Sequence, residues 1–156
     1  MEQAPPTPTL EYLCRITVEL AAPMSVGPTG LGERRVIPIT GGHVAGPHLS
    51  GDVLPGGADW QLVRPDSTAL LDARYTLRTT DGALIYVSNR GLRHGPPEIL
   101  ARLAQGEEID PTTYYFRTTP TFETGAPHYA WLNNIIAVCS GIRTISSVIL
   151  DIYIVH

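Results

Sequence analysis

Residues 68–89 read TALLDARYTLRTTDGALIYVSN, two runs of alternating residue character joined by the short segment TTDG. Asp81-Gly82 is among the strongest short signals for a β-hairpin, because both residue types tolerate the positive φ angles that tight hairpin turns require. In the first run every second residue is apolar, which is the pattern of a strand with one buried face. The stretch therefore predicts two antiparallel strands, 68–78 and 83–89.

The same alternation, interrupted by Gly, Pro and Asp, continues on both sides of this hairpin. It predicts a loop over 23–32 and further strands over residues 11–20, 35–39, 42–45, 49–54, 60–64, 114–122, 131–139 and 146–155. One helix is expected in GPPEILARLAQG, residues 95–106, because Pro97 suits the first turn and Gly106 ends the helix. Roughly eight to ten short strands with one short helix are typical of an all-β sandwich or a closed barrel. A barrel removes exposed strand edges and encloses a pocket, so we predict a single compact antiparallel β-barrel.

Length and composition fit one domain. The chain has 156 residues, of which 43% are hydrophobic, enough to bury a single core. Residues 1–9 are expected to form a flexible Pro/Thr-rich arm, and residues 10–156 the barrel. The arm lacks the charged and apolar regions of a secretory signal, and no run reaches the ~18 apolar residues that span a membrane. Cys14 and Cys139, far apart in the sequence, are expected to be free, buried thiols of a cytoplasmic protein.

The charged residues narrow the classes of partner and cofactor. The formal net charge is −4 without any basic cluster, so neither nucleic acid nor membrane is an expected partner. The eleven basic residues are all arginine, which excludes Schiff-base and lysine general-base chemistry. The five histidines lack the HxH and HExxH spacings of metal sites, and no phosphate-binding or nucleophile-elbow motif is present. We therefore expect no metal and no cofactor, and a small molecule as the ligand.

Candidate site residues come from strands whose two faces differ in polarity. In the run 68–78, Asp72 and Arg74 lie on the row opposite the apolar one, because residues two apart in a strand share a face. Their pairing has two interpretations that the sequence leaves open. They form a surface ion pair on a solvated face, or they lie in the barrel lumen, where an oriented Asp–Arg pair binds a carbonyl or carboxylate and moves a proton.

The segment 114–123 repeats this theme. Its mixed row holds Arg117, Glu123, a tyrosine and two threonines. A lumen lined by Arg117 and Glu123 would fit a small polar ligand, whereas Pro120 favours a solvated edge strand.

Aromatic residues alternate with polar ones in three further segments. In YAWLNN, strand geometry would place Tyr129, Trp131 and Asn133 on one face, and a buried asparagine needs hydrogen bonds from backbone or ligand. Tyr86 and Asn89 lie in a similarly mixed strand. In PGGADWQ, residues 55–61, we expect Trp60 to pack inside the barrel. Asp59 has the opposite parity, although the glycines before it could turn it inward.

Several of these segments are similar to the small proteins of the domain of unknown function 3237 family. The similarity lies in the run from Gly32 to Gly91, in YYFRTTPTFETGAPHYAWLNN and in the closing apolar strand, and it spans about residues 12–155. It implies a compact, self-associating β-barrel, a homodimer, which resembles in outline the allene-oxide-cyclase-type barrels with their mostly apolar lumen. The recurring positions of the family correspond here to Gly57, Asp59, Trp60, Asp72, Arg74, Tyr75, Tyr86, Asn89, Gly91, Arg117, Phe122, Glu123, Tyr129, Trp131 and Asn133.

Two hypotheses of function follow. In the first, the protein is a cofactor-independent isomerase, cyclase or hydro-lyase (lyase) acting on a small carbonyl-bearing or polyketide-like metabolite. An acid among Asp59, Asp72 and Glu123 would move the proton, and Arg74 or Arg117 would hold the oxyanion. The substrate would contact Trp60, Tyr86, Asn89, Tyr129, Trp131 and Asn133. In the second, the same barrel binds a small molecule without catalysis and its acids serve structural ion pairs; a filled lumen would indicate a purely structural protein.

Overall fold

The computed structural model describes Met1 and residues 3–156. The described residues form ten strands, one α-helix and two 3-10 helices. The strands are β1 (Leu10–Leu20), β2 (Met24–Thr29), β3 (Gly32–Ala45), β4 (Gly51–Val53), β5 (Ala58–Val63), β6 (Ala69–Thr79), β7 (Leu84–His94), β8 (Tyr115–Glu123), β9 (Ile136–Arg143) and β10 (Ser147–Val155). The helices are α1 (Pro97–Ala104), η1 (Pro111–Thr113) and η2 (Pro127–Asn134).

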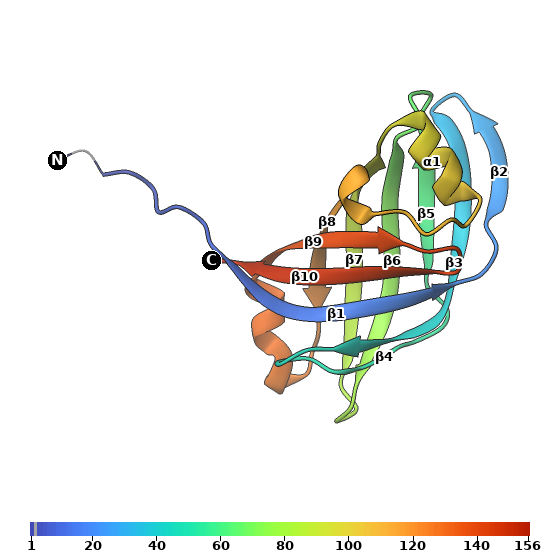
Figure 1. Cartoon of the computed structure of the whole chain (residues 1–156). Coiled ribbons are helices and arrows are strands. Elements are labelled where there is room, and N and C mark those ends of the chain that lie inside the picture. The colour runs from blue at the N-terminus through green and yellow to red at the C-terminus, as the bar shows by residue number, and fades with distance from the viewer. Residues whose placement is uncertain (2) are drawn as a thin grey trace.

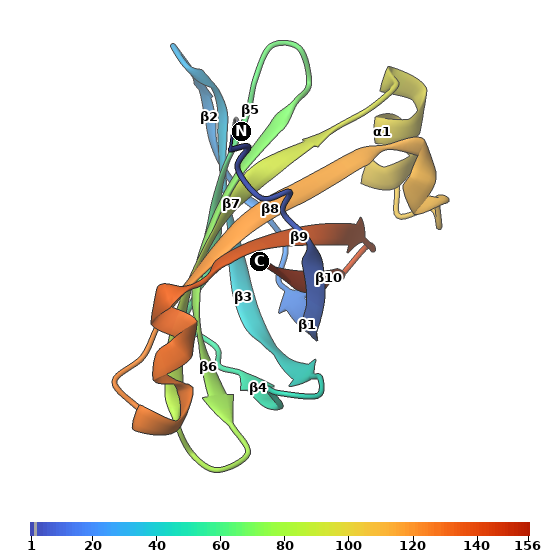
Figure 2. The same cartoon turned by 90° about the vertical axis from the view of Figure 1, so that its left-hand side faces the viewer.

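Eight strands close into an antiparallel barrel, and two strands are additional (Figures 1 and 2). Neighbours follow the order β1-β10-β9-β8-β7-β6, and β3 pairs back with β1. Between β6 and β3, β4 and β5 each pair with both strands, at different places along them. β2 pairs with β3. The predicted all-β barrel with one short helix is therefore confirmed.

The hairpin that opened the sequence analysis is the longest-paired unit of the barrel wall. β6 and β7 pair without interruption from Ala69↔Arg93 to Arg78↔Leu84. Gly82, in the turn, has a φ of 90°, as a tight hairpin turn requires. The second strand continues to His94, five residues beyond the predicted end. This extension brings Arg93 into the wall.

β3 is a single continuous strand. The sequence predicted the same residues as the end of a loop followed by two short strands. The first part of β3 pairs with β5 and its second part with β1. The partner changes between Pro38 and Ile39. Gly42, a few residues further on, pairs with Val18 and has a φ of 138°, and a Cβ there would lie 2.0 Å from the backbone oxygen of Thr17. The glycines therefore bend the strand without ending it. The predicted loop over 23–32 is wrong for the same region, because residues 24–29 pair with β3 as β2.

The prediction of a strand over 131–139 is wrong in its first half. Residues 127–134 form η2, which begins at Pro127, a residue suited to the first turn of a helix. The strand starts only at Ile136. The alternation argument for Tyr129, Trp131 and Asn133 therefore fails, because residues two apart do not share a face in a helix.

The two ends of the barrel are covered differently. Figures 1 and 2 place α1 at one end and η2 at the other. η2 inserts Leu132, which is 1% exposed, into the core. The Tyr129 hydroxyl donates to Asp81 at 2.9 Å. Cys14 and Cys139 are free and buried, as expected. No helix of the described residues is long and apolar enough to cross a membrane.

Gly57, next to β5, offers a test of how tightly the wall is closed. A Cβ there would lie 2.4 Å from the carbonyl oxygen of Arg74 and 2.7 Å from the Cβ of Tyr75. Gly57→Ala should therefore push β5 away from β6 and lower the free energy of unfolding by about 1–3 kcal/mol, measured by urea denaturation. The control is Gly125→Ala, where a Cβ would meet nothing within 4 Å. Equal midpoints for both variants would contradict this packing.

Candidate functional site

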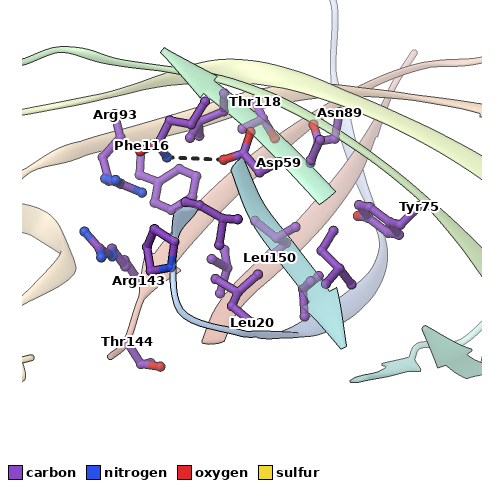
Figure 3. A pocket seen from close by; sticks show the side chains of 18 of the residues that line it. Leu20, Asp59, Tyr75, Asn89, Arg93, Phe116, Thr118, Arg143, Thr144 and Leu150 are labelled. Atoms are coloured by element: carbon purple, nitrogen blue, oxygen red, sulfur yellow. Dashed lines mark hydrogen bonds between the residues drawn. The ribbon is translucent and has the colours of Figure 1, made fainter. Parts of the chain in front are cut away.

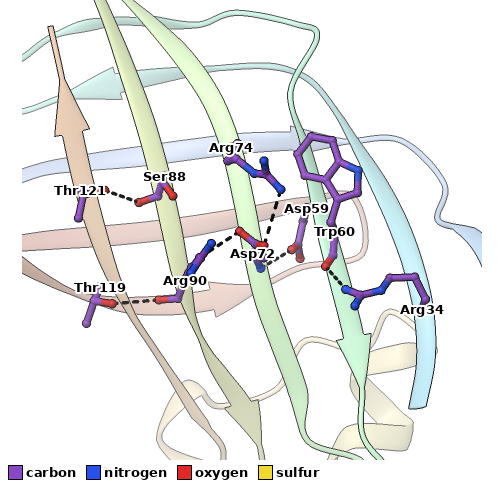
Figure 4. Close-up of polar contacts among 9 residues, drawn as sticks. All are labelled: Arg34, Asp59, Trp60, Asp72, Arg74, Ser88, Arg90, Thr119 and Thr121. Atoms are coloured by element: carbon purple, nitrogen blue, oxygen red, sulfur yellow. Dashed lines mark hydrogen bonds and ion pairs between the residues drawn. The ribbon is translucent and has the colours of Figure 1, made fainter. Parts of the chain in front are cut away.

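Side chains alternate between the inner and outer faces of each strand, and most of the polar residues predicted for the site lie on the outer face of the barrel. On β6, the row of Leu71, Tyr75 and Leu77 is buried in the interior. Asp72 and Arg74 lie on the opposite, outer face (Figure 4), where Asp72 pairs with Arg90 at 3.4 Å and with Arg74 at 3.8 Å. The surface interpretation of this pair is correct, and the expectation of a lumen Asp–Arg pair is wrong because the apolar row takes the interior.

β8 follows the same rule. Its burial alternates strictly, with Phe116 and Thr118 inside and the mixed row, including Arg117 and Glu123, exposed. Arg117 donates to the carbonyl of Phe116 at 2.9 Å and lies over the Tyr115 ring. The predicted lumen positions of Arg117 and Glu123 are therefore wrong.

The predicted aromatic wall is also outside. Trp60 lies half-buried on the outer face, where Arg74 covers its ring at 4.7 Å and the Trp60 carbonyl accepts from Arg34 (Figure 4). Tyr86 and Trp131 are 41% and 38% exposed. The expectation that Trp60 packs inside is wrong, because Asp59 and Gln61 take the inner row of β5, and the Arg74 guanidinium covers the Trp60 ring on the surface.

Asn133 and Tyr129 lie at the η2 end of the barrel. The Asn133 amide exchanges two hydrogen bonds with the backbone of Thr124, at 2.8 and 2.9 Å. Its polar groups are thus satisfied by the chain itself. Neither residue lines the cavity described next.

A cavity of about 80 Å³ lies inside the barrel, toward the α1 end (Figure 3). Most of its wall is apolar, with Leu71, Ala73, Phe116 and Leu150 among the lining residues. The polar side chains that line it are Asp59, Gln61, Tyr75, Asn89, Arg93, Thr118, Arg143 and Thr144. Of the residues predicted for the site, Asp59 and Asn89 are the ones in this lumen.

Asp59 is brought inside by β5 and faces Asn89 across one strand. The register pairs Asp59 with Ala73 and Ala73 with Asn89, so the three lie in one row. Asp59 is 9% exposed and Asn89 3%. Asp59 is therefore inside, as one alternative expected, but it faces the lumen by regular alternation with Gln61 and not through a glycine-assisted twist.

The hydrogen bonds of Asp59 only partly offset its burial. Its Oδ1 accepts from the backbone N–H of Asp72 at 2.9 Å, and its Oδ2 accepts from Gln61 Nε2 at 3.2 Å. Both bonds and the nearby charge of Arg93 favour the ionised form, but burial is the largest influence and raises the pKa of this carboxyl above its ordinary value of 3.8. Asp59 is thus a carboxyl group that can hold a proton more readily than a solvated one.

Three polar atoms of residues that line the same cavity as Asp59 have no partner with hydrogen-bond geometry. The Tyr75 hydroxyl, Asn89 Oδ1 and Thr118 Oγ1 are buried without a hydrogen bond in the described residues. Burial also raises the pKa of the Tyr75 phenol, which keeps it a neutral donor. Buried polar groups in proteins are nearly always satisfied, so these atoms indicate a polar ligand or ordered water in the lumen. A carboxyl group beside unpaired donors and acceptors in an apolar cavity can transfer protons and hold a developing oxyanion.

Sequence reasoning missed six polar lumen residues, and a signal existed for five of them. Gln61 shares the face of Asp59 by simple alternation, and Thr118 shares that of Phe116. Arg93 shares the face of Asn89, which would have been visible had the strand been extended to His94. Arg143 lies in a strand whose predicted end was four residues too early. Tyr75 was among the recurring family positions but was not selected for the site.

No group of three or more His, Cys, Asp or Glu side chains in the part of the chain that the structure describes is placed to hold a metal ion.

Comparison with known proteins gives close relatives of undefined activity. A family model described as "Protein of unknown function (DUF3237)" matches residues 8–155. A UPF0311 protein of Rhodopseudomonas palustris is 48% identical over 149 residues, covering 94% of this chain and 97% of the relative. The crystal structure of a conserved protein of unknown function from the same organism has a TM-score of 0.94 at 45% identity, covering 97% and 100% of the two chains.

A more distant relative carries a description of its activity. The hydroalkoxylation enzyme phnH of Penicillium herquei is 27% identical over 139 residues, covering 85% of this chain and 74% of the relative. The crystal structure of an enzyme from Penicillium herquei has a TM-score of 0.75 at 23% identity over the full length of both chains, which is a likeness of fold.

Proposed function

The chain belongs to the DUF3237 family, and on that premise we propose that it is a cofactor-independent acid/base enzyme that isomerises or cyclises a small carbonyl-bearing metabolite in the barrel lumen. The observation that carries the proposal is Asp59, a buried carboxyl with a raised pKa that shares its cavity with the unpaired polar atoms of Tyr75, Asn89 and Thr118. Perturbed carboxyl groups in apolar cavities are typical of catalytic acids and bases.

Hydroalkoxylation, the activity in the description of the distant relative, is a reaction that this set of groups can support. A base removes the proton of a substrate hydroxyl, and the oxygen forms a C–O bond to the β-carbon of a conjugated carbonyl. The C=C π electrons form a new double bond between the α-carbon and the carbonyl carbon, and the carbonyl π electrons move to oxygen to give an enolate. The protonated base then returns its proton to the α-carbon. Substrate and product are isomers, so the step needs no oxidant, reductant or second substrate.

Each role has a candidate in the lumen. Asp59 accepts the hydroxyl proton and returns it to carbon. Tyr75 donates its hydroxyl to the developing enolate oxygen, since its raised pKa keeps the phenol protonated. Asn89 and Thr118 position the substrate, and the apolar wall excludes water from the enolate.

The second candidate is a binding barrel without catalysis, and one observation favours it. Both oxygens of Asp59 already accept a hydrogen bond, as a structural carboxylate would. The two candidates differ in whether Asp59 exchanges a proton with a bound molecule.

The test uses dialysed wild-type protein and a panel of hydroxyl-bearing conjugated enones in D₂O. The expected result is a product of the same composition as its substrate, with one deuterium on the α-carbon, detected by mass spectrometry and NMR. Chelator in the buffer should not change the rate. Panel members that bind but return without deuterium would support the binding barrel and overturn the enzymatic proposal.

A further inference from the structure

Three arginines meet at the α1 end of the lumen. They are Arg35 on β3, Arg93 on β7 and Arg143 at the end of β9. Arg93 and Arg143 line the lumen cavity, and all three line a second hollow formed with α1. Figure 3 shows the guanidinium groups of Arg93 and Arg143 next to each other, with Asp59 farther along the cavity. Arg93 is 6% exposed.

The described part of the protein gives this arginine cluster no contact ion pair, although the charge of Asp59 favours the cation of Arg93 from a distance. Among the described residues, no carboxylate forms an ion pair with any of the three. Arg35 donates to the side-chain oxygen of Gln61, and its Nε is buried without a partner. Glu33 lines the outer hollow but is hydrogen-bonded to Ser25 at 3.3 Å.

The cations also repel one another. Burial, followed by the charge of Arg143, lowers the pKa of Arg93 to about 10, and burial and the charge of Arg35 lower that of Arg143. The Phe116 ring, 5.5 Å from Arg93 Cζ, offers a cation–π contact but no negative charge. A buried guanidinium without a contact ion pair, as Arg93 is, destabilises a fold, so a purely structural role does not account for its position beside the partly buried Arg35 and Arg143.

We propose that Arg35, Arg93 and Arg143 bind the carboxylate of an organic ligand whose apolar part occupies the lumen. The guanidinium fork matches a carboxylate with two parallel hydrogen bonds, and more than one guanidinium can share its charge. The apolar walls beyond Arg93 and Arg143 give the position of the rest of the ligand. The inference rests on the lumen being the ligand site of the proposed function, but not on the reaction.

A hydrogen-bond chain links this carboxylate site to the proposed proton-transfer group. Arg35 donates to Gln61, and Gln61 donates to Asp59. A carboxylate held by the arginines would therefore orient the ligand with its uncharged part toward Asp59 and Asn89. The substrate class that follows is a carboxylic acid with its carbonyl or enone group several bonds from the carboxylate.

The test measures binding of benzoate and of its neutral analogue benzamide by isothermal titration calorimetry. Wild-type protein should bind benzoate more tightly than benzamide. Arg93→Gln and Arg143→Gln should each weaken benzoate binding by about 10- to 100-fold, the usual effect of losing a buried charge-assisted hydrogen bond, and leave benzamide binding unchanged. The control is Arg78→Gln, because Arg78 is exposed on the outer face of β6.

The variants should fold. Arg93→Gln removes a buried charge that has no contact ion pair, so the thermal midpoint of this variant should be at least that of wild type. Three results would each overturn the proposal. They are equal affinity for benzoate and benzamide, benzoate binding that survives both substitutions, and binding of inorganic phosphate but not of benzoate. Arginine-dependent benzoate binding together with failure of the deuterium test would support this inference and reject only the enzymatic function.

Discussion

Asp59→Asn should lower kcat on any substrate found by the deuterium test by about 10²- to 10⁴-fold, the usual contribution of a positioned acid/base group. The amide cannot accept the hydroxyl proton. Its oxygen can still accept the hydrogen bond from the Asp72 N–H, while its NH₂ group replaces the oxygen that accepts from Gln61, so the weaker 3.2 Å bond is lost. The variant should therefore fold and bind, and lose the chemical step. Steady-state kinetics with product detection would measure this, and kcat should fall far more than KM changes.

Asp72→Asn is the matched control. Asp72 is the neighbouring carboxylate, but it lies on the outer face in a partly exposed ion-pair network with Arg74 and Arg90. Such pairs contribute little to stability, so activity should stay within about twofold of wild type. A comparable loss in both variants would indicate a general disturbance of β6 and would remove the case for Asp59.

The pH dependence of wild-type activity adds a second readout on the same residue. The base must be ionised in the free enzyme, and burial raises its pKa, so kcat/KM should rise with pH through a value above 3.8. The contribution of Asp59 to the stability of the fold has the opposite pH dependence and falls as the pH rises. A folded-state pKa above the unfolded one adds stability that is fully present below the unfolded pKa and is lost as pH rises through the folded one. The stability of Asp59→Asn relative to wild type should therefore increase as the pH rises above 3.8 through the raised pKa of Asp59.

The barrel could be predicted because short segments of the sequence specify its strands and turns. The Asp81-Gly82 turn and the alternation on both sides of it specify a long hairpin, and the register from Ala69↔Arg93 to Arg78↔Leu84 follows from them. The failures are also local in origin. Residues 40 and 41 were predicted to separate two strands although β3 continues through them, and η2 has apolar residues at a spacing that also fits a strand.

The interior of the site was harder to predict, because alternation indicates which residues share a face but not which face is inside. On β6 and β8 the more apolar row is inside, and applying that rule would have placed Asp72 and Arg117 on the surface. On β5 the same rule fails. Trp60 and Leu62 take the outer row, while Asp59 and Gln61 face the lumen. An enclosed polar site reverses the usual pattern, and the sequence of a single strand does not distinguish it from a solvated face.

Ala73→Phe should abolish ligand binding by filling the lumen. Ala73 lies in the row between Asp59 and Asn89 and lines a cavity of about 80 Å³, which a phenyl ring would largely occupy. We expect benzoate affinity and enone turnover to fall by more than about 100-fold, with little change in unfolding midpoint because the ring enters existing space. Thr76→Phe, on the outer face of the same strand, is the control and should bind benzoate like wild type. Normal benzoate binding by a folded Ala73→Phe protein would show that the ligand does not enter the lumen, and would contradict both the carboxylate site and the proposed role of Asp59.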